Sequence, residues 1–472
     1  MRTESDFIGS VRVPKDAYYG SFTVRAAENF KLSGTRVHGE VTRSVALIKK
    51  CAAMANMELG KLDRKSGDAI VKAADEVIAG KLDREFILDA FQAGAGTPLH
   101  MNVNEVIANR AEELLGGKKG EYKLIHPNNH VNMSQSSNDV TPTAVRLATL
   151  KLAEAVLREA EALRDAFSKK AGEHKDTMKI GRTHLQDAVP MTHGQAFAAY
   201  ARAIEKDIHE IQRAKDCVRE LGIGGTATGS GITAHPRFRE LVVKKLNDAT
   251  ANAYALVPAK DAVEMTQDMN DFVTFSSALR RYASSLDRIA NDLRLLVSGP
   301  KGGIAEIILP EVEPGSSIMP GKVNPSIPEA VNMACWQVMA NDYAILLAAR
   351  SGQFELNFGT PLIAHNILQS EELLANASSM FRRFCIDGME VDMARTAENF
   401  SRSFGYATAF NPYLGYKEVS LLVKEAYSAG VPLRELIVKK GLMTGDDVEK
   451  VIRSATGPSE VDPEIVKRVK KG

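Results

Sequence analysis

The sequence has few aromatic residues and almost no net charge, and these features limit the kinds of function that it can have. Aromatic residues make up 6% of the 472 residues, with a single Trp, and 60 Lys and Arg against 59 Asp and Glu leave a net charge of +1. Nucleic-acid-binding proteins normally carry a basic excess or patch that displaces counterions from phosphates. No run of Lys and Arg supplies one here, so we expect no nucleic-acid partner.

Long hydrophobic runs and paired cysteines are also missing. No run of about 18 apolar residues occurs, and the N-terminal MRTESDFIGSVRVPKDAYYG has no apolar core behind a basic start. We therefore expect a cytoplasmic protein that has no membrane partner. The four cysteines form no CxxC pair, which argues against a zinc knuckle or a redox dithiol. We expect neither a metal nor another cofactor.

Apolar residues at heptad spacing predict long helices. Between residues 263 and 297 they recur every seven positions, which keeps one apolar seam along a helix of about 50 Å at ~1.5 Å per residue. The residues of this seam are Met265, Phe272, Leu279, Leu286 and Leu293. Similar patterns occur at 144–167, 195–221 and 327–349. Long helices without strand patterns between them predict an all-α protein built on a helix bundle.

Two further features concern assembly and loops. The apolar 343–348 segment, YAILLA, would be exposed on a single bundle, so we expect the chain to associate. Stretches rich in Gly, Ser, Thr and Asn lie at 94–104, 126–143, 181–195, 222–235 and 313–325. Because binding and catalytic groups concentrate on loops held by a rigid scaffold, these stretches are the candidate functional regions.

Two glycine motifs resemble nucleotide-binding motifs in their residues but not in the structural context or spacing that those motifs require. Gly222-x-Gly224-x-x-Ala227 follows a helical pattern at 207–221, whereas the dinucleotide fingerprint needs a strand there. GSSIMPGK at 315–322 has one residue too many between its glycines, and Val323 stands where a phosphate loop has Ser or Thr. We therefore expect no nucleotide. Motifs of zinc proteases and acyl-transfer triads are also absent from the sequence.

The 313–325 stretch, EPGSSIMPGKVNP, is the strongest candidate loop. A surface linker gains nothing from Ile318 and Met319, which favour burial. The polar donors of the stretch suit a carboxylate, and they are Ser316, Ser317, Lys322 and Asn324. We therefore favour a functional loop over a linker.

The 134–139 stretch offers donors near the start of a long helix, which we expect to begin at Thr141-Pro142. Ser136, Ser137 and Asn138 are then either plain helix caps or ligands of an anion at the positive helix N-terminus. The sequence alone leaves both interpretations open.

His184 and Thr97 belong to two more polar turns. His184 follows Thr183 in GRTHLQD, and a single His is either structural or catalytic. Thr97 ends the turn GAGT. The candidate loops together present hydroxyls, amides, one Lys and one His, with no metal cage. That set of groups suits a small dianionic substrate.

These motifs occur in the order found in the fumarase/aspartase superfamily of lyases, which the chain resembles over nearly its whole length. The matching runs are GAGT with MNxNEVIANRA, HVNMSQSSND, GRTHLQDAVPMTxGQ, IANDLRLLxSGP and GSSIMPGKVNP, and the last looks like the family's signature loop. The resemblance implies a small N-terminal domain (1–138), a central five-helix bundle (139–392) and a small C-terminal domain (393–472). It also implies a homotetramer with a twenty-helix core, in which each active site takes loops from three subunits.

Carried over by motif, the resemblance implies a role for each candidate residue. Ser316 would be the general base that removes a proton next to a carboxylate. The groups that hold this carboxylate as it becomes an enediolate would be Lys322, Asn324 and Thr183. The groups that bind the other carboxylate would be Thr97, Ser136, Ser137 and Ser317. Asn138 and His184 would face the departing group, and Glu329 would orient His184. A secondary carboxylate site would contain His126 and Asn128.

A serine is a weak base, so this mechanism needs help from its surroundings. Removing the hydroxyl proton near neutral pH is unfavourable by several powers of ten, and each costs about 1.4 kcal/mol. Nearby cations and the backbone N–H groups of a closed Gly/Pro-hinged loop would have to supply that free energy. We therefore expect closure of the 313–325 loop to control turnover.

Two members of the family use nearly the same site: aspartate ammonia-lyase (aspartase), which converts L-aspartate to fumarate and ammonia, and class II fumarase, which converts L-malate to fumarate and water. Aspartase-like features are Asp16-AYYG, Lys119-GEY, AVPMTxGQ from Ala188, TQDMNDFVTFSSALRR from Thr266, and PSIPEAVN from Pro325. Fumarase-like features are Ser136-Ser137 and Ile363-AHNILQS. We expect an aspartase, with fumarase as the alternative.

Two segments match neither member, namely Pro98-Leu99-His100 and Phe358-Gly359-Thr360. They bear on substrate preference more than on the class of reaction. A third possibility is an inert structural relative, as the lens crystallins of this family are. We expect it less, because such relatives can lose catalytic groups and this chain retains Ser316, Lys322, Asn324 and His184.

Overall fold

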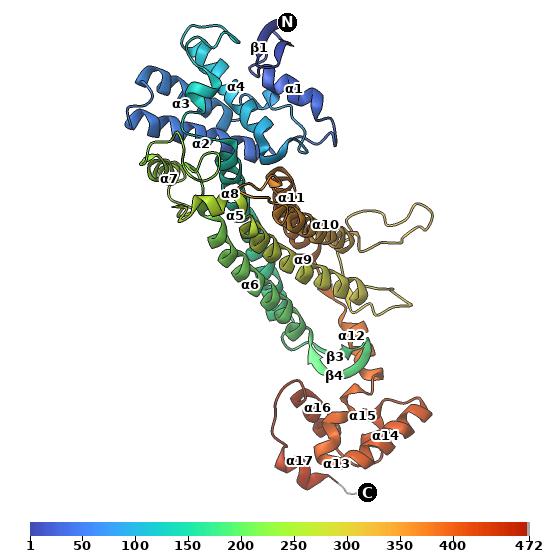
Figure 1. The fold of residues 1–472 in the computed structure, drawn as a ribbon. Coiled ribbons are helices and arrows are strands. Elements are labelled where there is room, and N and C mark those ends of the chain that lie inside the picture. The colour runs from blue at the N-terminus through green and yellow to red at the C-terminus, as the bar shows by residue number, and fades with distance from the viewer. Residues whose placement is uncertain (470–472) are drawn as a thin grey trace. The chain divides into compact units, whose positions relative to one another are not determined.

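A computed structural model describes residues 1–469, and in that range the chain is mostly helical, with little strand (Figure 1). The α-helices are α1 (Ser21–Asn29), α2 (Gly39–Glu58), α3 (Arg64–Ile78), α4 (Thr97–Leu114), α5 (Ser137–Glu173), α6 (His193–Val218), α7 (Phe238–Ala249), α8 (Ala262–Gln267), α9 (Asn270–Leu296), α10 (Ser326–Ala349), α11 (Thr360–Phe381), α12 (Met393–Arg402), α13 (Asn411–Leu414), α14 (Tyr416–Ala429), α15 (Leu433–Lys439), α16 (Gly445–Ser454) and α17 (Pro463–Arg468). Short helical turns are η1 (Asp83–Glu85), η2 (Gly94–Gly96), η3 (Pro127–Val131), η4 (Arg382–Ile386) and η5 (Gly405–Phe410). The all-α prediction is confirmed.

The strands of the described chain form four separate pairs. They are β1 (Arg2–Asp6) with β2 (Gly9–Val13), β3 (Met178–Thr183) with β4 (Gln186–Thr192), β5 (Glu220–Leu221) with β6 (Val257–Pro258), and β7 (Ile307–Ile308) with β8 (Glu390–Val391). Only the β5–β6 pair is parallel. Within residues 1–469, no helix combines the length and the apolar character that a bilayer crossing requires.

The chain divides into two compact units, which we describe separately. Unit 1 contains Met1–Arg158, Asp207–Ser284 and Ala334–Asn376. Unit 2 contains Glu159–Lys206, Ser285–Met333 and Ala377–Gly472, of which the structure describes the residues up to 469. The predicted domains 1–138, 139–392 and 393–472 come from the family resemblance, whereas the two units come from contacts within the structure. The three domains therefore stay a prediction. Residues 470–472 of the last domain lie outside the described range.

Five long helices, α5, α6, α9, α10 and α11, contribute residues to both units. In unit 1, Arg281 of α9 bonds Asp207 of α6 at 2.9 Å, and Asn341 of α10 bonds Ser370 of α11 at 3.1 Å. The same helices pack together in unit 2. There, for example, the rings of Phe167 on α5 and Phe381 on α11 lie edge to face. These contacts agree with the predicted five-helix bundle.

The predicted continuous helix at 263–297 is wrong. The segment contains α8 and α9, separated at Asp268, whose ψ of 128° is extended. The Asp268 carboxylate accepts a hydrogen bond from the Asn270 backbone N–H at 2.6 Å and so caps the second helix. Met265 and Phe272, on either side of the break, are both buried. The heptad pattern therefore marked a continuous buried face rather than a continuous helix.

Three other predicted boundaries differ from the structure. α5 begins at Ser137, earlier than the predicted start at Thr141-Pro142, because Ser136 accepts a hydrogen bond from the Asn138 N–H at 3.3 Å and caps the helix there. α6 ends at Val218, and the strand β5 follows it. The stretch 181–195, predicted as a loop, contributes to the β3–β4 hairpin.

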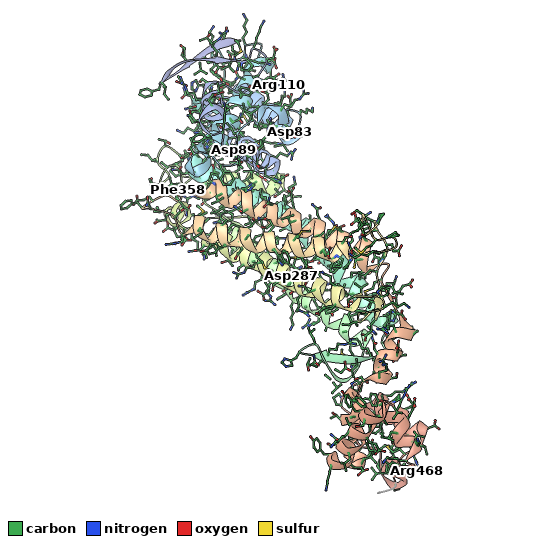
Figure 2. All side chains as sticks on the ribbon, turned by 90° about the vertical axis from the view of Figure 1, so that its right-hand side faces the viewer. Asp83, Asp89, Arg110, Asp287, Phe358 and Arg468 are labelled. Carbon is green, nitrogen blue, oxygen red and sulfur yellow. The ribbon has the colours of Figure 1, made fainter. Side chains whose placement is uncertain are left out.

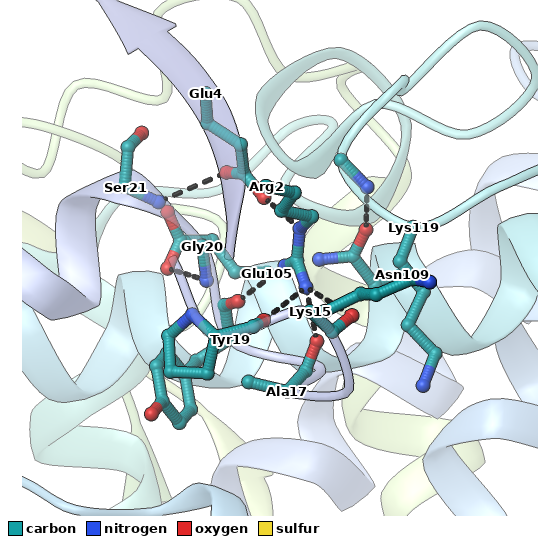
Figure 3. Close-up of polar contacts among 12 residues, drawn as sticks. Arg2, Glu4, Lys15, Ala17, Tyr19, Gly20, Ser21, Glu105, Asn109 and Lys119 are labelled. Carbon is teal, nitrogen blue, oxygen red and sulfur yellow. Dashed lines mark hydrogen bonds and ion pairs between the residues drawn. The ribbon is translucent and has the colours of Figure 1, made fainter. Parts of the chain in front are cut away.

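A polar network holds the N-terminal part of unit 1 together (Figure 3). Arg2 donates hydrogen bonds to the backbone carbonyls of Pro14, Lys15, Ala17 and Tyr19. The buried carboxylate of Glu105 accepts hydrogen bonds from the backbone N–H groups of Gly20, Phe22 and Thr23 and from the Thr23 hydroxyl. These contacts cap α1 and fix the preceding loop to α4.

Two of the aspartase-like segments meet in this network. Lys119 of the KGEY segment donates a hydrogen bond to the Asp16 carbonyl at 2.9 Å, and its ammonium lies 3.7 Å from the centre of the Tyr18 ring. Asn109 of α4 bonds both segments, through the Tyr18 carbonyl and the Gly120 N–H. Asp16-AYYG and Lys119-GEY are therefore one packing unit.

Candidate functional site

The predicted site residues are divided between the two units. Unit 1 contains Thr97, Ser136, Ser137, Asn138, His126 and Asn128. Unit 2 contains Thr183, His184, Ser316, Ser317, Lys322, Asn324 and Glu329. Each group is described below within its own unit.

In unit 1, the N-termini of α4 and α5 meet at two hydroxyls. Thr97 is the first residue of α4 and Ser137 is the first residue of α5, and their hydroxyl oxygens are 2.9 Å apart. The Asn138 amide donates a hydrogen bond to the Ala227 carbonyl at 2.8 Å, which holds this side chain beside the hydroxyls. The positive dipole ends of two helices favour a negative charge at this point. The arrangement suits a carboxylate.

Asp139 anchors the start of α5 from the buried side. Its carboxylate accepts hydrogen bonds from the N–H groups of Ser136, Gly224 and Thr226, each at 2.9 Å. Burial raises the pKa of Asp139, and these backbone hydrogen bonds act in the opposite direction. The glycine stretch that resembles a nucleotide fingerprint therefore binds a carboxylate of its own chain.

Behind this anchor lies a buried cluster that the sequence analysis did not identify as a whole. The Lys49 ammonium nitrogen is 2.8 Å from His100 Nε2 and 2.9 Å from the Asn132 side-chain oxygen. The same oxygen is 2.6 Å from His100 Nε2. Burial lowers the pKa of Lys49 and that of His100 well below their ordinary values. The Asn132 amide also donates to the Gln135 carbonyl, so the cluster supports the loop that leads to Ser136.

One signal could have revealed this cluster. Lys49 lies on α2 among buried apolar residues such as Val45, Ile48 and Ala52. A lysine on such a face must find a polar partner inside the protein. The sequence analysis noted His100 only as a departure from the family pattern. Nothing in the sequence indicates that Lys49 and Asn132 are the partners of His100.

Both segments that depart from the family pattern border the GAGT turn. The Ala95 N–H donates a hydrogen bond to the Phe358 carbonyl at 3.0 Å. Leu99 and Gly96 line a small, mostly apolar cavity together with Pro361 and His365, which follow Phe358-Gly359-Thr360. The two departures therefore change the surroundings of the same turn, close to Thr97.

His126 and Asn128 lie together at η3 in unit 1. His126 Nδ1 accepts hydrogen bonds from the Asn128 N–H at 3.1 Å and the Asn129 N–H at 3.3 Å. Burial, and then the neighbouring His130, lower the pKa of His126. The imidazole caps a helical turn, and its role in a carboxylate site stays a prediction.

In unit 2, Thr183 and His184 lie at the tip of the β3–β4 hairpin. Thr183 pairs with Gln186, so His184 and Leu185 form a two-residue turn, with φ values of 55° and 58°. Such a turn requires positive φ at both central positions, which is strained for residues other than Gly or Asn. Leu185 is 70% exposed, and His184 is exposed beside it. The hairpin therefore presents the imidazole outward.

The signature loop of unit 2 is closed at its base. The Gly315 N–H donates to the Lys322 carbonyl at 2.9 Å, and the Asn324 amide donates to the Gly315 carbonyl at 2.5 Å. A Cβ atom at position 315 would lie 2.5 Å from that Lys322 oxygen, so only Gly allows this closure. Within the closed loop, Ser317, Ile318 and Lys322 are exposed.

Ser316 faces the backbone donors of its own loop. Its hydroxyl oxygen accepts hydrogen bonds from the Met319 N–H at 3.0 Å and the Ile318 N–H at 3.3 Å. Ser316 and Lys322 both line the same open depression. Backbone N–H groups directed at this oxygen stabilise a negative charge on it.

Glu329, in the first turn of α10, lies 3.9 Å from the Arg294 guanidinium. In the described part of unit 2, Glu329 makes no hydrogen bond with His184. The orienting role of Glu329 stays a prediction. Residues 1–469 contain no group of three or more His, Cys, Asp or Glu placed to hold a metal ion.

The chain is similar to characterised lyases over almost its whole length. A family described as lyase matches residues 9–340, and the C-terminal region of fumarase C matches residues 407–456. An aspartate ammonia-lyase of a Bacillus species is 45% identical over 96% of each chain. A class II fumarate hydratase of Myxococcus xanthus is 44% identical over 96% of this chain and 97% of that protein.

Solved structures agree with this relationship. The fumarate lyase:delta crystallin of Brucella melitensis, bound to cobalt, has a TM-score of 0.93 and 44% identity, covering 97% of this chain and 100% of that one. The class II fumarase of Schistosoma mansoni has a TM-score of 0.92 and 35% identity with the same coverage. The resemblance inferred from the motifs is confirmed. The protein is an enzyme of the lyase class, and the chain belongs to the fumarase/aspartase superfamily.

Proposed function

We propose that the protein is an aspartate ammonia-lyase that converts L-aspartate to fumarate and ammonia. Ser316, as an alkoxide, takes a proton from the carbon next to one carboxylate. The electron pair of that C–H bond moves into the carboxylate and forms an enediolate. Its collapse makes the C=C bond and breaks the C–N bond, so ammonia and fumarate leave.

The observation that carries this proposal is the surroundings of the Ser316 oxygen. Two backbone N–H groups, at 3.0 and 3.3 Å, favour the charged form of the hydroxyl that the mechanism requires. Lys322, in the same loop, adds a cation. Preplaced donors of this kind are the commonest source of large rate enhancement.

Other site residues bind the two carboxylates of the substrate. Thr97, Ser136, Ser137 and Ser317 bind one carboxylate, and the two helix N-termini at Thr97 and Ser137 support that role. The residues that stabilise the enediolate are Lys322, Asn324 and Thr183. Asn324 bonds the Gly315 carbonyl in this structure, so its amide must turn toward substrate to take part.

The groups that serve the leaving group and a second ligand are part of the same proposal. Asn138 and His184 face the departing ammonia, and Glu329 orients His184. His126 and Asn128 form a secondary carboxylate site. Four copies of the chain form each tetramer, and three of them share each active site. Exposed Trp336, Tyr343 and Leu347 on the unit 1 part of α10 support such an assembly, since a monomer rarely leaves so much apolar surface in water.

The similar proteins support aspartate over malate as the substrate, but they include both activities. Aspartate ammonia-lyases at 42% to 46% identity occur among them, for example in Bacillus subtilis and Pseudomonas fluorescens. The alternative is a class II fumarate hydratase, and the Myxococcus xanthus relative at 44% identity favours it specifically.

The deciding experiment follows the ultraviolet absorbance of fumarate with purified protein. We expect fumarate to be consumed only when ammonium is present and to be formed from L-aspartate. Consumption of fumarate without ammonium, together with its formation from L-malate, would establish the hydratase instead. No turnover with either pair would establish an inert relative.

Ser316→Ala tests the base. We expect kcat to fall by about 10²–10⁴-fold, the usual effect of losing a general base. Ser420→Ala is the matched control, because this serine lies on the exposed helix α14 and bonds only the Tyr416 carbonyl. A Ser316→Ala protein that works at the rate of the control would refute the assignment.

A further inference from the structure

The hairpin that presents His184 is strained at its tip and must be held at its root. Both tip residues have left-handed backbone conformations, and the tip is exposed. A conformation of this kind is unfavourable and persists only when the surrounding structure determines it. The residue that enters the turn, next to Thr183, is Arg182, whose side chain is only 17% exposed.

Arg182 forms a two-pronged ion pair with Glu306. The two guanidinium nitrogens lie 2.6 and 3.1 Å from the two carboxylate oxygens. The Glu306 side chain is completely buried. Asn399 of α12 donates a third hydrogen bond to this carboxylate at 3.1 Å. A buried bidentate pair of this type is strongly directional, because the planar guanidinium matches the carboxylate in one orientation.

Glu306 is itself fixed by its backbone. Its N–H donates to the Leu296 carbonyl at 2.9 Å, and its carbonyl accepts from the Asp392 N–H at 3.0 Å. The next residues, Ile307 and Ile308, pair with β8. Figure 1 shows α12 beside β3 and β4 in this part of unit 2. Glu306 is therefore a rigid point on the segment that leads directly into the loop of Ser316.

The pair thus joins the roots of two site-bearing segments that are distant in sequence. We propose that the Arg182–Glu306 ion pair is a positioning element of the reaction, which holds the Thr183–His184 hairpin and the approach to the Ser316 loop to one buried carboxylate. The inference rests on the proposed function, because it assumes that these two segments carry catalytic groups. Neither Arg182 nor Glu306 touches substrate in this proposal; both act through the groups they position.

Arg182→Lys is the sharpest test, since lysine keeps the charge but cannot form the fork. We expect kcat to fall by about 10- to 100-fold, which is the effect of a misplacement of about 1 Å. KM should change far less. We also expect a larger deuterium isotope effect with aspartate labelled at the carbon that loses its proton, because a poorly placed base slows that step selectively.

The matched control is Arg468→Lys. Arg468, labelled in Figure 2, forms a two-pronged pair with the buried Asp447 in the C-terminal helices of unit 2, away from any predicted site residue. We expect this variant to keep its kcat and its isotope effect, and to lose less thermal stability than Arg182→Lys, because the Arg468 side chain is half exposed. Glu306→Asp, which shortens one partner, gives a second test should Arg182→Lys fail to fold.

The outcomes separate the two proposals. A wild-type protein that does not turn over aspartate, whether or not it acts on malate, contradicts the proposed function itself. A wild-type protein that turns over, with an Arg182→Lys variant whose kcat per folded protein and isotope effect match those of the Arg468→Lys control, overturns the positioning role and leaves a purely structural pair.

Discussion

Glu306 in unit 2 and Glu371 in unit 1 are both buried glutamates, but their polar partners differ. Both are completely removed from solvent. Glu306 bonds Arg182 and Asn399, and Lys179 lies 3.9 Å away. Among residues 1–469, neither carboxylate oxygen of Glu371 has a hydrogen-bond partner.

The two carboxyls consequently have opposite acidities. Burial alone would raise the pKa of Glu306, but the hydrogen bonds and charge of Arg182 overcome it and hold the pKa below its ordinary value. Burial raises the pKa of Glu371 well above its ordinary value, and the charge of Glu372 adds to that effect. Burial therefore sets the cost of ionisation, and the partners decide whether the group is ionised.

The largest effect should come from removing the paired glutamate. Glu306→Leu leaves Arg182 and Lys179 without their carboxylate in a buried place. We expect the free energy of unfolding to fall by about 3–5 kcal/mol, as it does when one partner of a buried pair is lost. Chemical denaturation at fixed protein concentration measures this change, and a loss below about 1 kcal/mol would show that water reaches Arg182.

Glu105 of unit 1 provides an intermediate case, because its buried carboxylate accepts four hydrogen bonds and, within residues 1–469, forms no ion pair. Glu105→Gln places an amide NH₂ against backbone N–H groups. We expect a loss of about 1–3 kcal/mol, the penalty for unpaired buried donors. Glu28→Gln on exposed α1 is the control and should change little. Equal effects of the two variants would contradict the capping role of Glu105.

The unpaired glutamate should be revealed by pH. A carboxyl whose pKa is raised in the folded state contributes stability below its ordinary pKa, and that contribution is lost as the pH rises through the folded-state pKa. We therefore expect Glu371→Gln to be more stable than wild type by about 1–2 kcal/mol at pH 8 and nearly equal to it at pH 4.

The same pH series should give the opposite result for Glu306. Its lowered pKa stabilises the fold above the ordinary carboxyl pKa, and this contribution disappears as the pH falls through the folded-state pKa. Glu306→Gln should therefore differ from wild type most at neutral pH and least in acid. Parallel pH curves for the two variants would break the comparison, since both groups would then be ionised alike.

The smallest effect should come from Lys179→Met. Burial lowers the pKa of Lys179, and its attraction to Glu306 acts against that shift. Burial outweighs the attraction, so the ammonium adds little to the fold, and we expect the free energy of unfolding to change by less than about 1 kcal/mol. A loss as large as that of Glu306→Leu would mean that Lys179, rather than Arg182, neutralises the carboxylate.

Much of the scaffold was predictable because its helices are long and amphipathic. The segments 144–167 and 327–349 lie within α5 and α10, since apolar spacing reports the buried face directly. The break at Asp268 was not predicted, because one capping carboxylate interrupts a helix without changing the buried face. The β3–β4 hairpin was not predicted. The stretch 181–195 is short and polar, and it has no clear alternation of apolar and polar residues that would indicate paired strands.

The candidate site was predictable as a list of residues and not as a set of contacts. Motif order identified Ser316 and Thr97, but not that Ser316 accepts two backbone N–H groups or that Thr97 meets Ser137. Lys49 was missed because a lysine among apolar residues shows only that a partner exists. Arg182 was part of a recognised motif, yet its partner Glu306 lies 124 positions further along the chain.

By itself, the sequence determined the class of fold and the chemistry on offer, because helical periodicity and the order of motifs are properties of neighbouring residues. Tertiary structure decided which buried charges are paired, as the contrast between Glu306 and Glu371 shows. The physical reason is that ionisation inside a protein depends on groups within a few ångströms in space, and a linear sequence does not state which groups those are.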